Sequence, residues 1–350
     1  MTVMMAGGGT GGHVVPALAV ARELSKRGHR PVFVGTREGF EAKLVPKEGF
    51  AIEYIRIGGL NRVGWQAAAR TLAQLPASVA SSWSAIRRHR PSAMFSMGGY
   101  VAGPPMIAAA MARVPMVAME PNAVPGMVTR RLAPFVRRAL VGFAETASHF
   151  PGRAEITGLP VRDEFFAIPP KPRGDRLTIL ITGGSQGSKR INETVRAAWP
   201  LLREGTAPVR LIHQTGAVMH EEIAAAFATA GIEGEVVSFI ADMPARFAEA
   251  DLIVGRAGAG AVSELCAAGK PSILVPFPYA ADDHQTKNAH ALERVGAALT
   301  IADSDLTPAR LCEAVRAAGE RLESMSAAAR ALAKPGAASR AADVLEEVAR

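Results

Sequence analysis

Four glycine-bearing loops, each between an expected strand and an expected helix, constrain the fold of this chain more than any other feature. Two lie in the first half of the sequence, at residues 7–13 and 97–104, and two in the second half, at residues 182–188 and 255–260. Glycine allows unusual backbone angles and close approach of a ligand, and the helix N-terminus behind such a loop attracts phosphate. One such loop also serves as a tight turn, but four of them favour substrates with more than one diphosphate.

Short apolar runs alternate with helical patterns throughout the chain. We expect strands at residues 2–6, 31–35, 93–96, 116–119 and 139–142, and again at residues 177–182, 209–214, 236–239, 252–254 and 272–275. This alternation predicts an α/β fold with doubly wound parallel sheets. A proline-rich stretch at residues 168–175 is typical of a linker. The sequence therefore predicts two tandem Rossmann-like domains that are joined near residue 163 and face a cleft at the carboxyl ends of their strands.

The first loop raises the question of a dinucleotide site. Gly7, Gly9 and Gly12 match the G-x-G-x-x-G spacing formally, which leaves a NAD-dependent oxidoreductase as an alternative. The acidic residue that such an enzyme needs after its second strand is missing, because residues 32–37 end in Thr36 and Arg37. Neither the first nor the third loop is a Walker A sequence.

Basic residues are concentrated in the first half of the chain. Residues 1–162 contain 20 Lys and Arg against 8 Asp and Glu, a net charge of +12, whereas residues 163–350 contain 20 against 24, a net charge of −4. This asymmetry favours an anionic partner for the first half, with drift in an arginine-rich proteome as the alternative. We expect no nucleic acid, because no recognised motif accompanies the charge. We also expect no signal peptide and no membrane-spanning segment.

Three polar residues of the first half are candidates for chemistry. His13 stands at an expected helix start, where a neutral imidazole can accept a proton from an attacking hydroxyl; a capping or phosphate contact is the alternative. Glu120 and Asn122 follow the strand at residues 116–119. Glu120 is either a second catalytic candidate or a carboxylate that orders its neighbours, and the amide of Asn122 suits sugar hydroxyls.

The second half offers a complementary set. Glu264 lies on the helix after the fourth loop, where a carboxylate suits a ribose diol; ordinary helix N-terminal charge is the alternative. Gln285 and Asn288 are three residues apart and share one helical face, which suits the hydroxyls of a sugar. The acidic residues next to His284 have no second set of ligands, so we expect no metal.

A segment at residues 64–91 has the pattern of a membrane-contacting helix. Its apolar residues recur at helical spacing and a basic cluster follows them. The alternative is a core-facing helix with a solvated basic end. The residues that we expect at a membrane surface are Trp65, Leu72, Leu75, Val79, Trp83, Arg87 and Arg88.

The loops together resemble a known family, the bacterial undecaprenyl-diphospho-muramoylpentapeptide β-N-acetylglucosaminyltransferases of the GT-B glycosyltransferase superfamily. The matching segments, in the family's order, are residues 8–13, 98–101, 120–122, 158–162, 183–187, 256–259 and 283–289. Two positions depart from the family pattern. Leu159 stands where the family often has Asn, which puts any polar role there in doubt, and Pro121 stands where Gln is common.

The resemblance implies a role for each matching segment. Residues 1–162 would bind the acceptor and the membrane, with a helix at residues 337–350 packing back onto them, and residues 163–336 would bind the donor. The acceptor diphosphate would lie at Gly9, Gly98, Gly99 and Tyr100. The donor, UDP-N-acetylglucosamine, would be bound by Thr10, Gly11, Gly12, Asn122, Arg162, Ser185, Gln186, Ile240, Ala259, Gly260, Ala261, Glu264, Gln285 and Asn288. His13 and Glu120 would be the catalytic residues.

The resemblance also implies an activity. The enzyme would transfer N-acetylglucosamine, with inversion, to the 4-hydroxyl of the muramoyl unit of undecaprenyl-diphospho-MurNAc-pentapeptide (lipid I), giving lipid II for peptidoglycan synthesis. No cofactor would be needed, and the protein would be peripheral on the cytoplasmic face of the inner membrane, at an anionic surface and among cell-wall synthesis proteins. The alternatives are another GT-B enzyme, such as a lipid glycosyltransferase or a UDP-GlcNAc epimerase, the oxidoreductase, and a non-catalytic membrane scaffold.

Overall fold

The computed structural model describes residues 1–58, 65–172, 174–204 and 208–350. Residue 64 of the expected membrane helix and residue 173 of the expected linker lie outside the described residues. The chain divides into two compact units, which we call unit 1 (Met1–Pro160 with Lys334–Arg350) and unit 2 (Val161–Ala333). The expected boundary at residues 162 and 163 lies two residues beyond the observed one.

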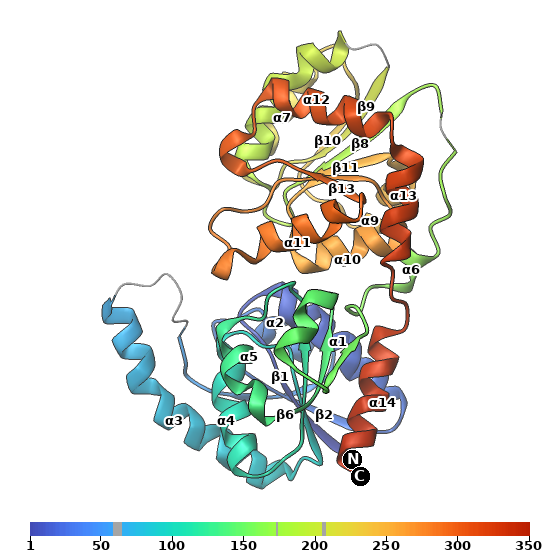
Figure 1. Ribbon diagram of the computed structural model, residues 1–350. Coiled ribbons are helices and arrows are strands. Elements are labelled where there is room, and N and C mark those ends of the chain that lie inside the picture. Colours follow the sequence, from blue (N-terminus) through green and yellow to red (C-terminus); the bar gives the residue numbers. More distant parts are fainter. Residues whose placement is uncertain (59–64, 173, 205–207) are drawn as a thin grey trace. The chain divides into compact units, whose positions relative to one another are not determined.

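Unit 1 contains a parallel sheet in the order β3-β2-β1-β4-β5-β6-β7 within the described residues (Figure 1). Its central strands are continuous apolar runs that are buried on both faces, as strands of parallel sheets usually are. The strands are β1 (Thr2–Ala6), β2 (Arg30–Gly35), β3 (Ala51–Tyr54), β4 (Ala93–Ser96), β5 (Met116–Glu120), β6 (Val136–Val141) and β7 (Ala154–Ile156).

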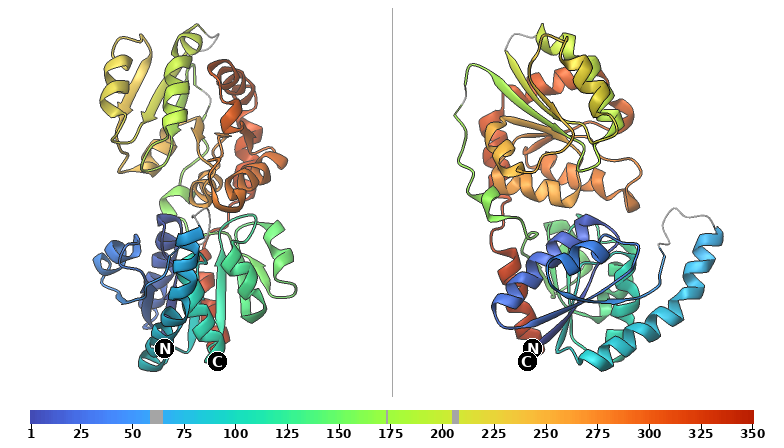
Figure 2. Two further views of the ribbon diagram at one scale, coloured as in Figure 1. Left: turned by 90° about the vertical axis from the view of Figure 1, so that its left-hand side faces the viewer. Right: turned by 180° about the vertical axis from the view of Figure 1, so that it is seen from behind.

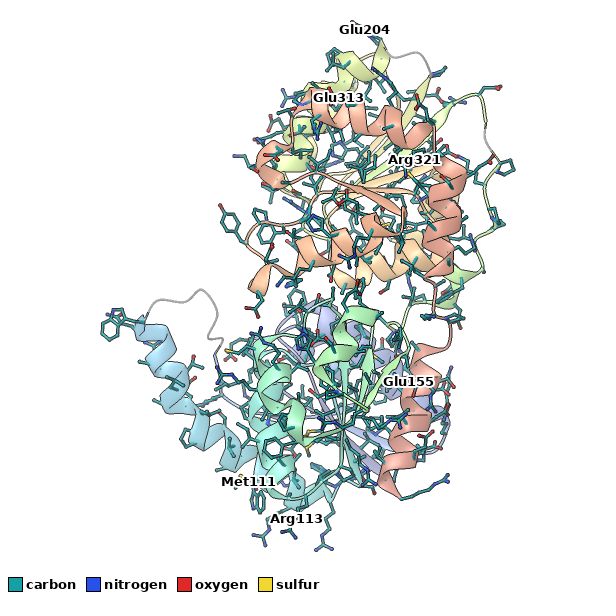
Figure 3. The ribbon with its side chains drawn as sticks, viewed as in Figure 1. Met111, Arg113, Glu155, Glu204, Glu313 and Arg321 are labelled. Atoms are coloured by element: carbon teal, nitrogen blue, oxygen red, sulfur yellow. The ribbon has the colours of Figure 1, made fainter. Side chains whose placement is uncertain are left out.

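Helices cover both faces of this sheet. They are α1 (Gly11–Lys26), α2 (Glu41–Lys47), α3 (Trp65–His89), α4 (Gly103–Met111), α5 (Met127–Leu132) and α14 (Ala337–Ala349). The last helix packs against α1 and the central strands, so both marked chain ends lie on unit 1, side by side in Figures 1 and 2. Arg27 pairs with Asp343 at 2.6 Å, and Arg340 makes a two-pronged contact with Glu155, which borders α14 in Figure 3.

Unit 2 repeats the design with a sheet in the order β10-β9-β8-β11-β12-β13 within the described residues. The strands are β8 (Leu177–Thr182), β9 (Val209–Gln214), β10 (Glu233–Val237), β11 (Leu252–Gly255), β12 (Ser272–Leu274) and β13 (Ala298–Thr300). The helices are α6 (Asp163–Phe166), α7 (Lys189–Arg203), α8 (His220–Phe227), α9 (Met243–Glu249), α10 (Ala259–Ala268), α11 (His284–Arg294), α12 (Pro308–Gly319) and α13 (Leu322–Ala331). Two doubly wound α/β sheets confirm the predicted fold class.

The strand order reverses next to the first strand of each sheet. In unit 1 it reverses between β1 and β4, and in unit 2 between β8 and β11. All four glycine loops follow these four strands. In open α/β sheets the ligand lies at the carboxyl end of the strands where the order reverses. The topology therefore places one pair of glycine loops at the expected ligand position of each unit.

Candidate active site

The two glycine loops of unit 1 interlock at the ends of β1 and β4. A Cβ added at Gly9 would lie 2.7 Å from Cε1 of Tyr100, and a Cβ at Gly99 would lie 3.3 Å from Cε1 and Nδ1 of His13. Both glycines have positive φ, +82° and +76°. Glycine is therefore required at these positions by the backbone and by the neighbouring side chains.

Gly11 and Gly12 are different, although they belong to the same loop. A Cβ at Gly11 would meet no atom within 4 Å, and one at Gly12 would meet only Oγ1 of Thr10, at 3.8 Å. These two residues form the first turn of α1, whose N–H groups point out of the helix toward its N-terminal end. The open space and the partial positive charge make this turn a surface for an anion.

His13 lies on the same turn and its Nδ1 is 3.0 Å from Oγ1 of Thr10. For Nε2 to act as a base, Nδ1 must carry the ring proton and donate it to the Thr10 hydroxyl. The Thr10 hydroxyl can accept this hydrogen bond, so the contact is compatible with the tautomer that a base at Nε2 requires.

Glu120 stands at the end of β5 and is only 3 % exposed. Its carboxyl group accepts hydrogen bonds from the backbone N–H of Asn122 at 3.2 Å, from Nδ2 of Asn122 at 3.3 Å and from the N–H of Gly126 at 3.4 Å. Burial raises the pKa of Glu120 to about 7, and these hydrogen bonds offset only part of that effect. A carboxyl group with this pKa can exchange a proton near neutral pH.

The second glycine loop brings both catalytic candidates together. Gly99 packs against His13, and a Cβ at the adjacent Gly98 would lie 3.9 Å from Oε2 of Glu120. His13 and Glu120 therefore border one short stretch of backbone, which their sequence separation does not reveal, and Asn122 is hydrogen-bonded to Glu120.

In unit 2 the third glycine loop is held by the turn after β9. A Cβ at Gly187 would overlap the carbonyl oxygen of Thr215, and one at Gly216 would overlap that of Gln186. Ser188 caps α7 by accepting a hydrogen bond from the N–H of Ile191. Ser185 and Gln186 are exposed at the tip of the loop.

The fourth loop is fixed by Arg256, a residue of the matching segment 256–259 to which the sequence assigns no role. Its guanidinium donates to the carbonyls of Val275 and Pro276, to Oδ1 of Asp303 at 2.6 Å and to Oγ of Ser188 at 2.8 Å. Arg256 thereby connects the fourth loop to Ser188, the N-cap of α7, which is the helix after the third loop. Behind it, Ala259, Gly260 and Ala261 form the first turn of α10, and a Cβ at Gly260 would meet no atom within 4 Å.

Four further residues of unit 2 are candidates for binding the donor substrate. Burial raises the pKa of Glu264 to about 7, and the positive charge of Arg162 opposes the rise. Oε1 of Gln285 accepts from the N–H groups of Ala257 and Phe277. Asn288 is fully buried and donates to the carbonyl of Ala257 at 3.1 Å, so its side chain supports the fourth loop from below. Ile240 is also buried.

The residues expected at a membrane fall into two groups. Trp65 and Leu72 are 80 % and 57 % exposed, and Arg87 and Arg88 are exposed as well. Val79 and Trp83 pack against the core of unit 1, and Leu75 is half-buried. The first turns of α3 stand clear of the rest of unit 1 in Figures 1 and 2. The exposed apolar surface is thus narrower than expected and lies toward the start of α3.

Other expectations concern single positions and ions. Leu159 is 3 % exposed and packs beside Gly142, so this position contributes to the core of unit 1. Among the described residues there is no group of three His, Cys, Asp or Glu side chains that could hold a metal ion. None of the described helices has the length and apolarity that crossing a bilayer requires.

Comparison with known proteins gives matches along the whole chain. Residues 3–141 match the N-terminal domain of glycosyltransferase family 28, and residues 178–348 match its C-terminal domain. A UDP-N-acetylglucosamine–N-acetylmuramyl-(pentapeptide) pyrophosphoryl-undecaprenol N-acetylglucosamine transferase of Solibacter usitatus is 62 % identical over 348 residues, covering 99 % of this chain and 96 % of the relative. The enzyme of the same name from Azotobacter vinelandii is 43 % identical, covering 99 % of each chain.

Solved structures agree. MurG of Acinetobacter baumannii has a TM-score of 0.85 and 32 % identity, covering 99 % of each chain. A UDP co-structure of MnaA from S. aureus has a TM-score of 0.68 at 16 % identity, covering 97 % of this chain and 94 % of that one, which shows a shared fold alone.

Proposed function

Because this chain belongs to glycosyltransferase family 28, and to the N-acetylglucosamine transferases within it, we propose that it transfers N-acetylglucosamine from UDP-N-acetylglucosamine to lipid I, giving lipid II. The observation that carries the proposal is the 62 % identity over nearly the full length, joined to a pair of glycine loops at the reversal point of each sheet. Family membership leaves no observation in favour of the oxidoreductase or the scaffold.

In the proposed reaction the 4-hydroxyl oxygen of the muramoyl unit attacks the anomeric carbon of the donor sugar. The bond from that carbon to the diphosphate oxygen breaks, UDP leaves, and the configuration inverts. His13 accepts the hydroxyl proton at Nε2, in the tautomer whose Nδ1–H donates to the hydroxyl of Thr10. Helix N-termini and loop N–H groups stabilise the charge that develops on the leaving diphosphate.

Each unit supplies one substrate surface in this proposal. In unit 1 the acceptor diphosphate lies at Gly98 and Gly99 and at the open first turn of α1. This proposal moves Gly11 and Gly12, which the resemblance assigns to the donor, to the acceptor. In unit 2 the donor diphosphate lies at Ser185 and at the first turn of α10, with Glu264 on the ribose. Gln285 orders the backbone that binds the donor while it contacts the sugar, and Asn288 acts through the fourth loop.

We further propose that the protein is peripheral on the cytoplasmic face of the plasma membrane. The acceptor is a membrane lipid, Trp65 and Leu72 are strongly exposed on α3, and residues 1–162 carry a net charge of +12. Partner proteins of cell-wall synthesis would meet the enzyme there.

Release of UDP tests the main proposal. The assay uses UDP-N-acetylglucosamine with and without a short-chain lipid-diphosphate muramoyl acceptor, and UDP-N-acetylgalactosamine as the control donor. We expect release that depends on the acceptor and on the glucosamine donor. Release without acceptor would instead indicate a hydrolysing epimerase, and no release by the folded protein would refute the proposal. His13→Ala should lower turnover about 100-fold or more, and a loss of only a few-fold would exclude His13 as the base.

A further inference from the structure

Glu41, the first residue of α2, is a buried acid that the proposed reaction does not use. Its side chain has no exposed surface. Oε2 accepts a hydrogen bond from the N–H of Gly9 at 2.8 Å, and Oε1 accepts from the N–H and the hydroxyl of Thr36, each at 2.8 Å. All three donors are neutral, so the carboxylate is bound much as a loop of backbone N–H groups binds a free anion.

Three glycines make room for this carboxylate. A Cβ at Gly8 would lie 2.5 Å from Cδ and Oε1 of Glu41, and Cβ atoms at Gly35 and Gly39 would overlap the same side chain. These glycines come from the first loop, from the end of β2 and from the turn before α2. A cradle built from three separate segments indicates that the position of the Glu41 carboxylate is specified by the fold.

The cradle divides the first glycine loop into two halves. The inner half consists of Gly8 and Gly9. There the N–H of Gly9 already donates a hydrogen bond to Glu41, and the two glycines are packed against Glu41 and Tyr100. In the outer half, Gly11 and Gly12 are open. A diphosphate that approached the inner half would meet a competing negative charge, whereas the outer half presents the N-terminus of α1.

We propose that Glu41 is a positioning residue whose carboxylate acts as a built-in anion: it fixes the inner half of the first loop and directs the acceptor diphosphate to the first turn of α1. The inference rests on the proposed function. It also changes the expectation for Gly9, whose role becomes the anchoring of the loop. The pKa of Tyr100, beside the same loop, is raised by burial and then by the charge of Glu41.

Glu41→Gln tests the proposal because it keeps the shape and removes the charge. A carboxamide has one acceptor oxygen, so if it serves Thr36 its Nε2 must face the N–H of Gly9, and that hydrogen bond is lost. Losing one charge-assisted hydrogen bond at the loop should raise the KM for the lipid-diphosphate acceptor about tenfold. The KM for UDP-N-acetylglucosamine should stay unchanged. The matched control is Glu38→Gln, the same substitution at an exposed position three residues away.

The UDP-release assay, with one substrate saturating and the other varied, separates the outcomes. An unchanged acceptor KM in folded Glu41→Gln would overturn the proposal. A fall in kcat with both KM values unchanged would also overturn it, because that result indicates only a structural loss of active enzyme. If Glu41→Gln does not fold, Thr36→Val, which removes one donor, should raise the acceptor KM about threefold, and no change there overturns it. Failure of the wild-type protein to release UDP would refute the proposed function itself, independently of any variant.

Discussion

Replacing Glu120 by glutamine should remove a pH dependence from the stability of unit 1. The wild-type carboxyl group is 3 % exposed, and burial raises its pKa to about 7. Glutamine has nearly the same shape, does not titrate between pH 4 and 9, and keeps an oxygen that can accept from Asn122. A pH-dependent difference in stability between the wild-type protein and Glu120→Gln therefore reports the protonation of Glu120.

The sign and size follow from the two pKa values. In the unfolded chain this group has a pKa of 4.5, so between pH 4.5 and about 7 the folded protein holds a proton that the unfolded chain has released. A raised pKa gives stability that is fully present below pH 4.5 and is lost as the pH rises through about 7. The difference corresponds to about 3 kcal/mol in the free energy of unfolding.

Denaturant titrations at pH 5, 6, 7 and 8, followed by hydrogen exchange of peptides from β4 and β5, measure this in unit 1. Relative to Glu120→Gln, the wild-type protein should lose about 2.5 kcal/mol between pH 5 and pH 8, since part of the effect lies below pH 5. Glu38→Gln, an exposed change in the same unit, should follow the wild type at every pH. A difference between wild type and Glu120→Gln that stays flat with pH would show that burial does not shift this group.

Three further substitutions probe unit 2. Gly260→Ala has room for its Cβ and should stabilise α10 by about 0.5 kcal/mol while raising the KM for UDP-N-acetylglucosamine, as thermal melts and donor titrations will show. Gly187→Ala should destabilise unit 2 by about 1–3 kcal/mol more than Gly184→Ala, because both have positive φ but only Gly187 meets a backbone carbonyl; equal melting temperatures would refute this. Arg256→Ala should cost about 1–3 kcal/mol, because it removes the hydrogen bonds to Asp303 and Ser188, and a melting temperature close to that of the wild type would contradict it.

The sequence predicts the central strands well and the outer strands poorly. The expected strands at residues 2–6, 93–96, 177–182 and 209–214 agree with β1, β4, β8 and β9, because central parallel strands are continuous apolar runs. The outer strands β3, β7 and β13 were not expected, since they are short and half-exposed. The expected strand at residues 236–239 was displaced by two to three residues, because β10, also an outer strand, is Glu233–Val237.

For the site, local sequence predicts the loops but not what holds them. Glycine spacing and strand–helix alternation locate the four loops, because the glycines and the apolar runs that flank them lie within a few residues of one another in the sequence. Glu41 is 32 residues from Gly9, and Arg256 is 68 residues from Ser188, so no local pattern reports either contact. The glycines around Glu41 are the only local hint, and spacing alone does not distinguish a cradle from a turn.

The docking of α14 on unit 1 has a consequence for synthesis on the ribosome. Unit 2, residues 161–333, is translated between the body of unit 1 and the helix that completes it. At roughly 5–20 residues per second this interval lasts about 10–35 s. Throughout it the nascent chain carries a nearly finished sheet in which α14 does not yet cover β4, β5 and β6, and Arg27 and Glu155 lack their partners Asp343 and Arg340. Chaperones therefore have access to the surface of β4, β5 and β6 during this interval, and a chain that stalls before residue 337 leaves this surface uncovered even when all of unit 2 has been made.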